Sequence, residues 1–78
     1  MFRQCQSFAS GSRLRMIDGF VYGDEGDRVL LQLADQVWLI DGVRGFVCMG
    51  LIDAISDEYI SVDGHEFLFR NLCFIGKE

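Results

Sequence analysis

The sequence predicts an all-β fold, a small and strongly bent five-stranded barrel, and three observations indicate it. Asp63-Gly64 is a two-residue hairpin signal between two runs of β character, 59–62 and 65–69. Short apolar runs alternate with turn residues along most of the chain, which is typical of a barrel or a sandwich. The 78 residues contain no proline and no linker, so we expect a single domain over 1–78.

The N-terminal dozen residues are predicted to differ from the rest. Phe2, Cys5 and Phe8 recur at a three-residue spacing, which is typical of one or two helical turns. Ser10-Gly11-Ser12 would end such a helix. We therefore expect residues 1–12 to be a short helix or a flexible segment and residues 13–78 to be the barrel.

The first half of the predicted barrel contains three strands. They cover 13–22, 28–33 and 37–40, and Gly19 is expected to place a bulge or a sharp bend in the first. Residues 23–27 are a turn, because their acids and glycines lack the spaced oxygen ligands and the terminal Glu of a calcium loop. Residues 34–36 form a tight turn.

The second half begins after a turn at Asp41-Gly42. Residues 43–55 are long for one strand, and Gly45 and Gly50 are expected to let it bend as at a barrel corner. After a turn at 56–58, the strand 59–62 pairs with 65–69. The strand 72–75 then closes the domain beyond a kink at Arg70-Asn71.

Charge and hydrophobicity rank the classes of partner. Twelve acidic and seven basic residues give a net charge of −5, which disfavours nucleic acid and favours a basic protein partner. We interpret Arg3, Arg13 and Arg15 as solvated charges. Half of the residues are hydrophobic, with seven Phe and one Trp, more than so small an interior holds, so we predict a homo-oligomer.

Little in the sequence indicates catalysis. His65, the one histidine, follows the hairpin glycine. Asp63 and Glu66 flank it in sequence, but strand neighbours point to opposite faces, so this adjacency is little evidence for a catalytic pair. Asp53, Asp57 and Glu58 are interpreted as solvated turn charges. We therefore expect no enzyme activity, no catalytic residues, no metal site and no cofactor.

The cysteines and the apolar runs bear on location. Cys5, Cys48 and Cys73 form no CxxC pair, so zinc-knuckle and thioredoxin-type sites are excluded, and Cys48 and Cys73 are expected to fill the core. No signal segment and no apolar run of about 20 residues occurs. We expect a reduced, cytoplasmic protein that does not enter the membrane.

Trp38 is the most informative aromatic residue. Within 37–40 (VWLI) its neighbours Val37 and Leu39 would occupy the opposite face, so both faces of the strand are apolar. Such a strand is central in its sheet or lies at a subunit contact. We predict an apolar binding face around Trp38 and Phe46.

Two segments resemble the motifs of the Sm-like family (Sm, LSm and Hfq proteins). Asp41-Gly42, Gly50 and 57–62 (DEYISV) are similar to its first motif, and 69–75 (FRNLCFI) is similar to its second. The resemblance implies a strongly bent five-stranded barrel whose subunits join strand to strand into rings. An SH3-like barrel fits the same pattern.

The resemblance also bears on RNA. It implies a nucleotide pocket with Tyr59 and Arg70, but Ser61 stands where the family has Asn, and no Gly follows Arg70. The leading prediction is therefore a non-enzymatic, self-associating interaction module, one version being an acidic regulator of a basic protein. The alternatives are an Sm-like RNA-binding ring and a small-molecule binder at a subunit interface. The predicted interaction residues are Trp38, Phe46, Tyr59 and Arg70.

Overall fold

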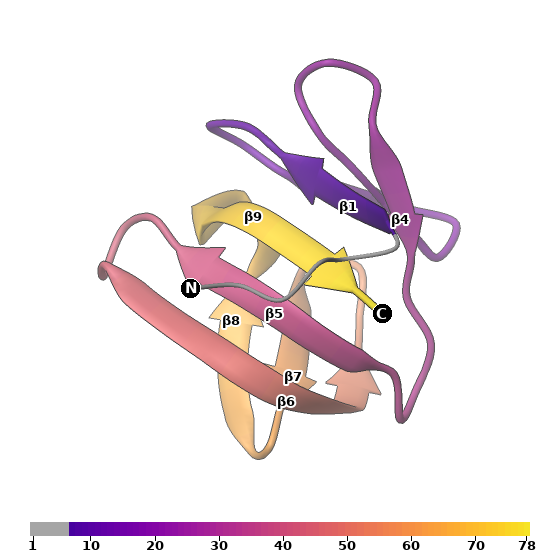
Figure 1. The fold of residues 1–78 in the computed structure, drawn as a ribbon, viewed down its shortest axis with the longest axis vertical. Helices are drawn as coiled ribbons and strands as arrows, with labels where there is room; N and C mark the ends of the chain where they lie inside the picture. Colours follow the sequence, from indigo (N-terminus) through magenta and orange to yellow (C-terminus); the bar gives the residue numbers. More distant parts are fainter. Residues whose placement is uncertain (1–6) are drawn as a thin grey trace.

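The computed structural model describes residues 7–78 and confirms the all-β prediction (Figure 1). These residues form nine strands and one short 3₁₀ helix: β1 Ser7–Ser10, β2 Arg15–Ile17, β3 Phe20–Tyr22, β4 Arg28–Leu30, β5 Gln36–Asp41, β6 Phe46–Ile55, β7 Tyr59–Val62, β8 His65–Leu68, η1 Phe69–Asn71 and β9 Leu72–Lys77.

The strands form two antiparallel sheets. One has six strands in the order β1-β9-β5-β6-β7-β8, and the other has three in the order β2-β3-β4. Within residues 7–78 the larger sheet ends at β1 and β8, so hydrogen bonds do not close it into the predicted barrel. The sheet is nevertheless curled, because the first part of β6 pairs with β5 and its last part pairs with β7.

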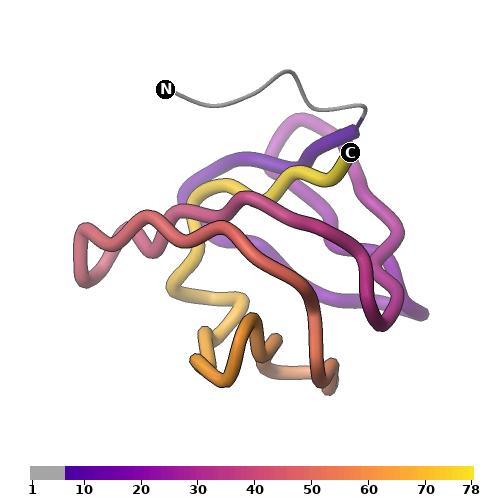
Figure 2. The backbone as a smooth tube through the Cα atoms, turned by 60° about the horizontal axis from the view of Figure 1, so that its bottom comes forward, coloured from indigo at the N-terminus to yellow at the C-terminus, as the bar shows by residue number. Residues whose placement is uncertain are grey.

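The bend in β6 lies close to Gly50, as the sequence predicts. Gly50 is opposite Val37 of β5, whereas Ile52 is already opposite Val62 of β7, and the register shifts directly after it. A Cβ atom at Gly50 would collide with the side chain of Asp63, so glycine lets the β7–β8 turn approach the strand. Figure 2 shows β6 running beside β5 and then turning away from it. Gly45 lies instead in the β5–β6 loop, with φ of 67°.

The predicted N-terminal helix is wrong for residues 7–10, which form β1. The part of that prediction before Ser7 lies outside the described residues. β1 pairs antiparallel with β9, Phe8 stacks on Phe74 with ring centroids 5.7 Å apart, and Ala9 is fully buried. Alternation between an exposed Phe8 and a buried Ala9 has the period of a strand, and β9 supplies the backbone partners.

Two Asp-Gly turns reverse the chain. Asp63-Gly64 joins β7 to β8 as predicted, with φ of 51° and 83°. Asp18-Gly19 has nearly the same geometry, φ of 52° and 86°, and divides the predicted strand 13–22 into β2 and β3. Positive φ at both central residues is what a tight hairpin requires, and glycine adopts it without steric cost.

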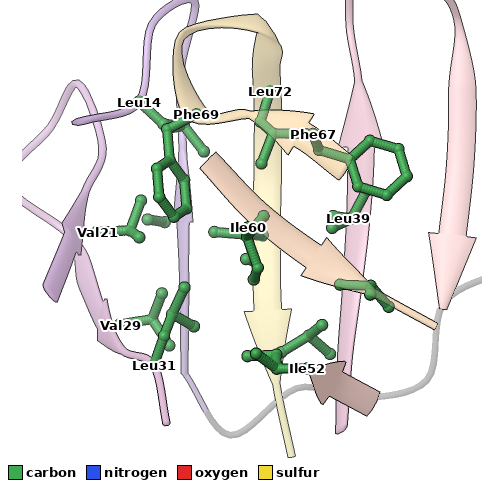
Figure 3. Close-up of a cluster of buried hydrophobic side chains, with 14 residues drawn as sticks. Leu14, Val21, Val29, Leu31, Leu39, Ile52, Ile60, Phe67, Phe69 and Leu72 are labelled. Atoms are coloured by element: carbon green, nitrogen blue, oxygen red, sulfur yellow. The ribbon is translucent and has the colours of Figure 1, made fainter. Parts of the chain in front are cut away.

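The core lies between the curled sheet and the small sheet (Figure 3). Val21 and Val29 enter it from β3 and β4, and Phe69 enters it from η1, where the sequence predicts a kink. The full cluster is Ala9, Leu14, Val21, Val29, Leu31, Val37, Leu39, Ile52, Ile60, Val62, Phe67, Phe69, Leu72 and Ile75. Trp38 is buried but does not belong to this cluster.

Candidate interaction surface

Trp38 lies on a strand inside the larger sheet, which is one of the two positions that the sequence predicts for it. β5 has β9 on one side and β6 on the other, and Val37, Trp38 and Leu39 are all buried. Val37 and Leu39 belong to the core cluster, so the side chain of Trp38 lies on the opposite, outer side of the sheet. Only 3 % of Trp38 is exposed.

The strand register defines the residues that share this side with Trp38. Met49 and Gly76 are directly opposite Trp38, and Gly76 is in turn opposite Phe8. The same register gives ten residues on one side of β1, β9, β5 and β6, which we call the outer sheet face: Phe8, Ser10, Gln36, Trp38, Ile40, Val47, Met49, Leu51, Phe74 and Gly76. None of these ten described residues carries a charge.

The most exposed part of this face is a strip along β6. Val47, Met49 and Leu51 are 57 %, 53 % and 51 % exposed. Phe8 adds a further exposed ring at the β1 edge. Exposed faces of antiparallel sheets usually carry polar side chains, so this continuous apolar strip makes the outer sheet face the candidate interaction surface. The sequence analysis did not identify these three residues as interaction residues, although their spacing of two places them on one face of a strand.

Phe46 does not share the face of Trp38. It is opposite Asp41 in the β5–β6 pairing, on the inner side of the sheet, and its ring stacks on Phe67 with centroids 6.0 Å apart. With Arg44 and His65 it lines a surface hollow of about 260 Å³. The predicted binding face around Trp38 and Phe46 is therefore two separate surfaces, because the register places the two side chains on opposite sides.

Asp41 organises the loop beside Phe46. Its buried carboxylate accepts hydrogen bonds from the backbone N–H groups of Val43 and Arg44, each at 3.0 Å, and pairs with Arg44 Nε at 2.8 Å. The Arg44 guanidinium also lies 5.4 Å from the Phe67 ring centroid. Burial by itself would raise the pKa of Asp41, but the hydrogen bonds from Arg44 and Val43 hold it below its ordinary value.

Tyr59 and Arg70 are not brought together as a pocket. Tyr59 is half-buried on β7 opposite Leu68, whereas Arg70 is exposed on η1. Arg70 lines another surface hollow of about 260 Å³ together with Arg15, Asp57 and Glu58, and Tyr59 lies outside it. In the part of the chain that the structure describes, no hydrogen bond or cation–π contact joins Tyr59 to Arg70.

Asp53 and His65 are titratable residues near the β7–β8 turn. Asp53 accepts a hydrogen bond of 2.7 Å from the backbone N–H of Gly64, and hydrogen bonds from the Ser61 side chain and from Gly64 lower the pKa of Asp53. His65 is exposed at the start of β8. Among residues 7–78, no three His, Cys, Asp or Glu side chains lie close enough to hold a metal ion.

Cys48 packs against the core cluster, as predicted. Burial raises the pKa of its thiol, and the negative charge of Asp63 raises it further. Within residues 7–78, Cys48 and Cys73 are both free thiols. No helix in this part of the chain is long and apolar enough to span a bilayer.

Comparison with known proteins adds no relative. No protein-family model matches the chain, and no curated protein sequence or solved structure matches it.

Proposed function

We propose that this protein is a non-enzymatic, self-associating interaction module and that two copies meet through the outer sheet face. The observation that carries the proposal is the composition of that face: ten residues without a charge, of which Val47, Met49 and Leu51 are more than half exposed. The partner to which we commit is a second copy of the same chain.

Charge favours a second copy meeting this face in particular. Each copy carries a net charge of −5, so two copies repel one another at long range. When two copies meet through a surface without ionisable groups, no acidic side chain of one copy faces an acidic side chain of the other. Such a contact also buries no unpaired charge. The acidic residues then remain outside the contact, where they favour a basic protein as a further partner.

The exposed side chains of this face contribute part of the area and of the energy that a dimer requires. A standard interface takes roughly 800 Å² from each partner, which is about one sixth of the 4843 Å² surface of the chain. Burying the exposed halves of Val47, Met49 and Leu51 contributes about 1 kcal/mol for each side chain. In a two-fold symmetric dimer every such contact occurs twice.

The family relationship is part of this proposal. The five strands β5 to β9, with β6 bent strongly between its two partners, support a fold related to Sm-like or SH3-like barrels.

The cysteines bear on the location that we propose. Cys48 and Cys73 are partly buried free thiols, which supports a reducing compartment such as the cytoplasm.

Sedimentation velocity on the wild type and on Met49→Lys tests the proposal. We expect the wild type to be a dimer, and we expect Met49→Lys to be a monomer because the dimer would bury two unpaired ammonium groups. Leu33→Lys is the matched control, since Leu33 is 65 % exposed in the β4–β5 connection and outside the outer sheet face. A monomeric wild type, or equal dissociation by both variants, contradicts the proposal.

A further inference from the structure

The small sheet carries a second unusual surface. Its inner residues Met16, Val21 and Val29 pack on or within the core, so the alternate residues point outward. The outward residues form two cross-strand rows, Arg15–Tyr22–Arg28 and Ile17–Phe20–Leu30. We call these six residues the arginine–aromatic platform.

Each arginine of the platform lies against an aromatic ring. The Cζ atom of Arg28 is 4.5 Å from the Phe20 ring centroid, and that of Arg15 is 5.9 Å from the centroid of Tyr22. The two rings are themselves 6.4 Å apart with an interplanar angle of 47°. A guanidinium at this distance is attracted by the face of the ring, and its N–H groups can still donate to an acceptor.

Neither guanidinium is neutralised. Among the described residues, the ion pairs are Arg44–Asp41 and Lys77–Asp35, and neither Arg15 nor Arg28 has a carboxylate partner. Acidic residues outnumber basic ones by twelve to seven in the whole chain, yet none of the six platform positions is acidic. The platform therefore combines arginine and aromatic side chains on an acidic protein, with Asp57 and Glu58 lining the hollow beside Arg15 at one edge.

We propose that the platform binds a short stretch of single-stranded nucleic acid. Bases stack on the guanidinium planes and on the uncovered parts of Tyr22 and Phe20, while phosphates accept hydrogen bonds from the edges of Arg15 and Arg28. Stacking between bases and aromatic or guanidinium planes is the main way in which proteins hold single strands without reading sequence. An acidic peptide would use the arginine edges but leave the flat surfaces unused, so the platform favours nucleotides.

The size and the surrounding charges limit the ligand to a few nucleotides. Three adjacent strands span only about 10 Å. Asp24, Glu25 and Asp27 follow β3 directly in the turn to β4, and they repel phosphates beyond the platform. The whole-chain charge of −5, which disfavours a long polyanion, does not oppose a contact that involves two or three phosphates.

Fluorescence anisotropy with a short, labelled, mixed-sequence single-stranded RNA at low salt tests this proposal. Arg28→Gln and Tyr22→Leu are the platform variants, and Tyr22→Leu retains an apolar side chain while removing the ring. We expect each to weaken binding by about 5- to 100-fold. For Arg28→Gln, the logarithm of the association constant should also fall less steeply with log[salt]. The magnitude of this slope should decrease by about 0.7, which corresponds to one lost phosphate contact.

Arg70→Gln is the matched control. It removes the same charge from an exposed arginine that is not one of the six platform residues but lines the hollow beside Arg15. Arg70 is also the arginine that the Sm-like resemblance would place in a nucleotide pocket, so this variant separates the platform from that hollow. We expect it to change the affinity less than two-fold. If Arg70→Gln weakens binding as much as Arg28→Gln does, the platform is not the site.

Three further results would overturn the proposal: no binding by the wild type at low salt, equal affinity for a duplex of the same sequence, or equal affinity for a glutamate-rich peptide. Should a variant fail to fold, the wild type alone decides the question by NMR. The ring resonances of Tyr22 and Phe20 should shift on addition of RNA, and unchanged ring resonances in the bound state contradict stacking. These measurements are independent of the dimer contact, since Met49→Lys should bind RNA as the wild type does.

Discussion

A small number of side chains determine how the turns of this molecule are held. Asp41 is the clearest case, because a single buried carboxylate accepts both loop N–H groups and the Arg44 guanidinium. Asp63 and Asp53 serve the opposite end in a similar way, through contacts to Leu51 and Gly64. These aspartates account for part of the acidic composition through hydrogen bonds that hold the backbone.

Replacing Asp41 by Asn should lower the free energy of unfolding by about 1–3 kcal/mol at neutral pH, because the amide cannot pair with Arg44. The pKa of Asp41 is lowered in the folded state, so its stabilising contribution is present above the unfolded value of about 4 and is lost as pH falls through the folded value. Urea unfolding should therefore show a difference between wild type and Asp41→Asn that shrinks in acid.

The control for this experiment is Asp57→Asn, an exposed turn residue for which the structure shows no comparable set of donors. It should change stability by less than about 0.5 kcal/mol. An Asp41→Asn difference that is as large in acid as at neutral pH would show that the carboxylate charge does not stabilise the loop.

At the scale of elements, the two Asp-Gly hairpins determine strand pairing. The β7–β8 turn was predicted from sequence, because positive φ at consecutive residues is a local requirement that Asp-Gly meets. The same dipeptide occurs at Asp18-Gly19, where the sequence predicts a bulge or a sharp bend within one strand because Gly19 interrupts it. It creates the β2–β3 hairpin and hence the platform.

Gly64→Ala should destabilise the protein by about 1 kcal/mol. An alanine there has space, so the cost comes from its φ of 83° alone. Gly42→Ala is the control, since Gly42 does not have a positive φ and its added Cβ would make an ordinary contact with Cys73. Thermal unfolding should separate the two variants, and equal effects would contradict the turn geometry.

At the scale of the whole molecule, part of the apolar surplus that the sequence shows lies in the core and part lies on the outer sheet face. Trp38 is buried on that face while Val47, Met49 and Leu51 remain exposed. The composition therefore predicts that surplus apolar surface exists, and the strand register determines which residues carry it.

If the outer sheet face joins two copies, Tm should rise with protein concentration, because dissociation accompanies unfolding. Each tenfold increase in concentration should add about 1.4 kcal/mol to the unfolding free energy of the dimer. Differential scanning calorimetry of the wild type over a wide concentration range measures this effect. The Tm of Met49→Lys should not depend on concentration, and a constant wild-type Tm would contradict a dimer coupled to folding.

The sequence by itself determined the all-β class, the Asp63-Gly64 hairpin, the bend near Gly50 and the apolar character of both faces of the Trp38 strand. These features depend on local backbone preferences and on the two-residue period of strands, which are readable within a few residues. Only the tertiary structure decided that residues 7–10 form a strand, because that strand requires the edge of β9 from the other end of the chain. The tertiary structure also placed the side chains of Trp38 and Phe46 on opposite sides of the sheet. It placed Arg15, Tyr22 and Arg28 next to one another on neighbouring strands. Both results depend on the cross-strand register, which is set by how separate segments pair.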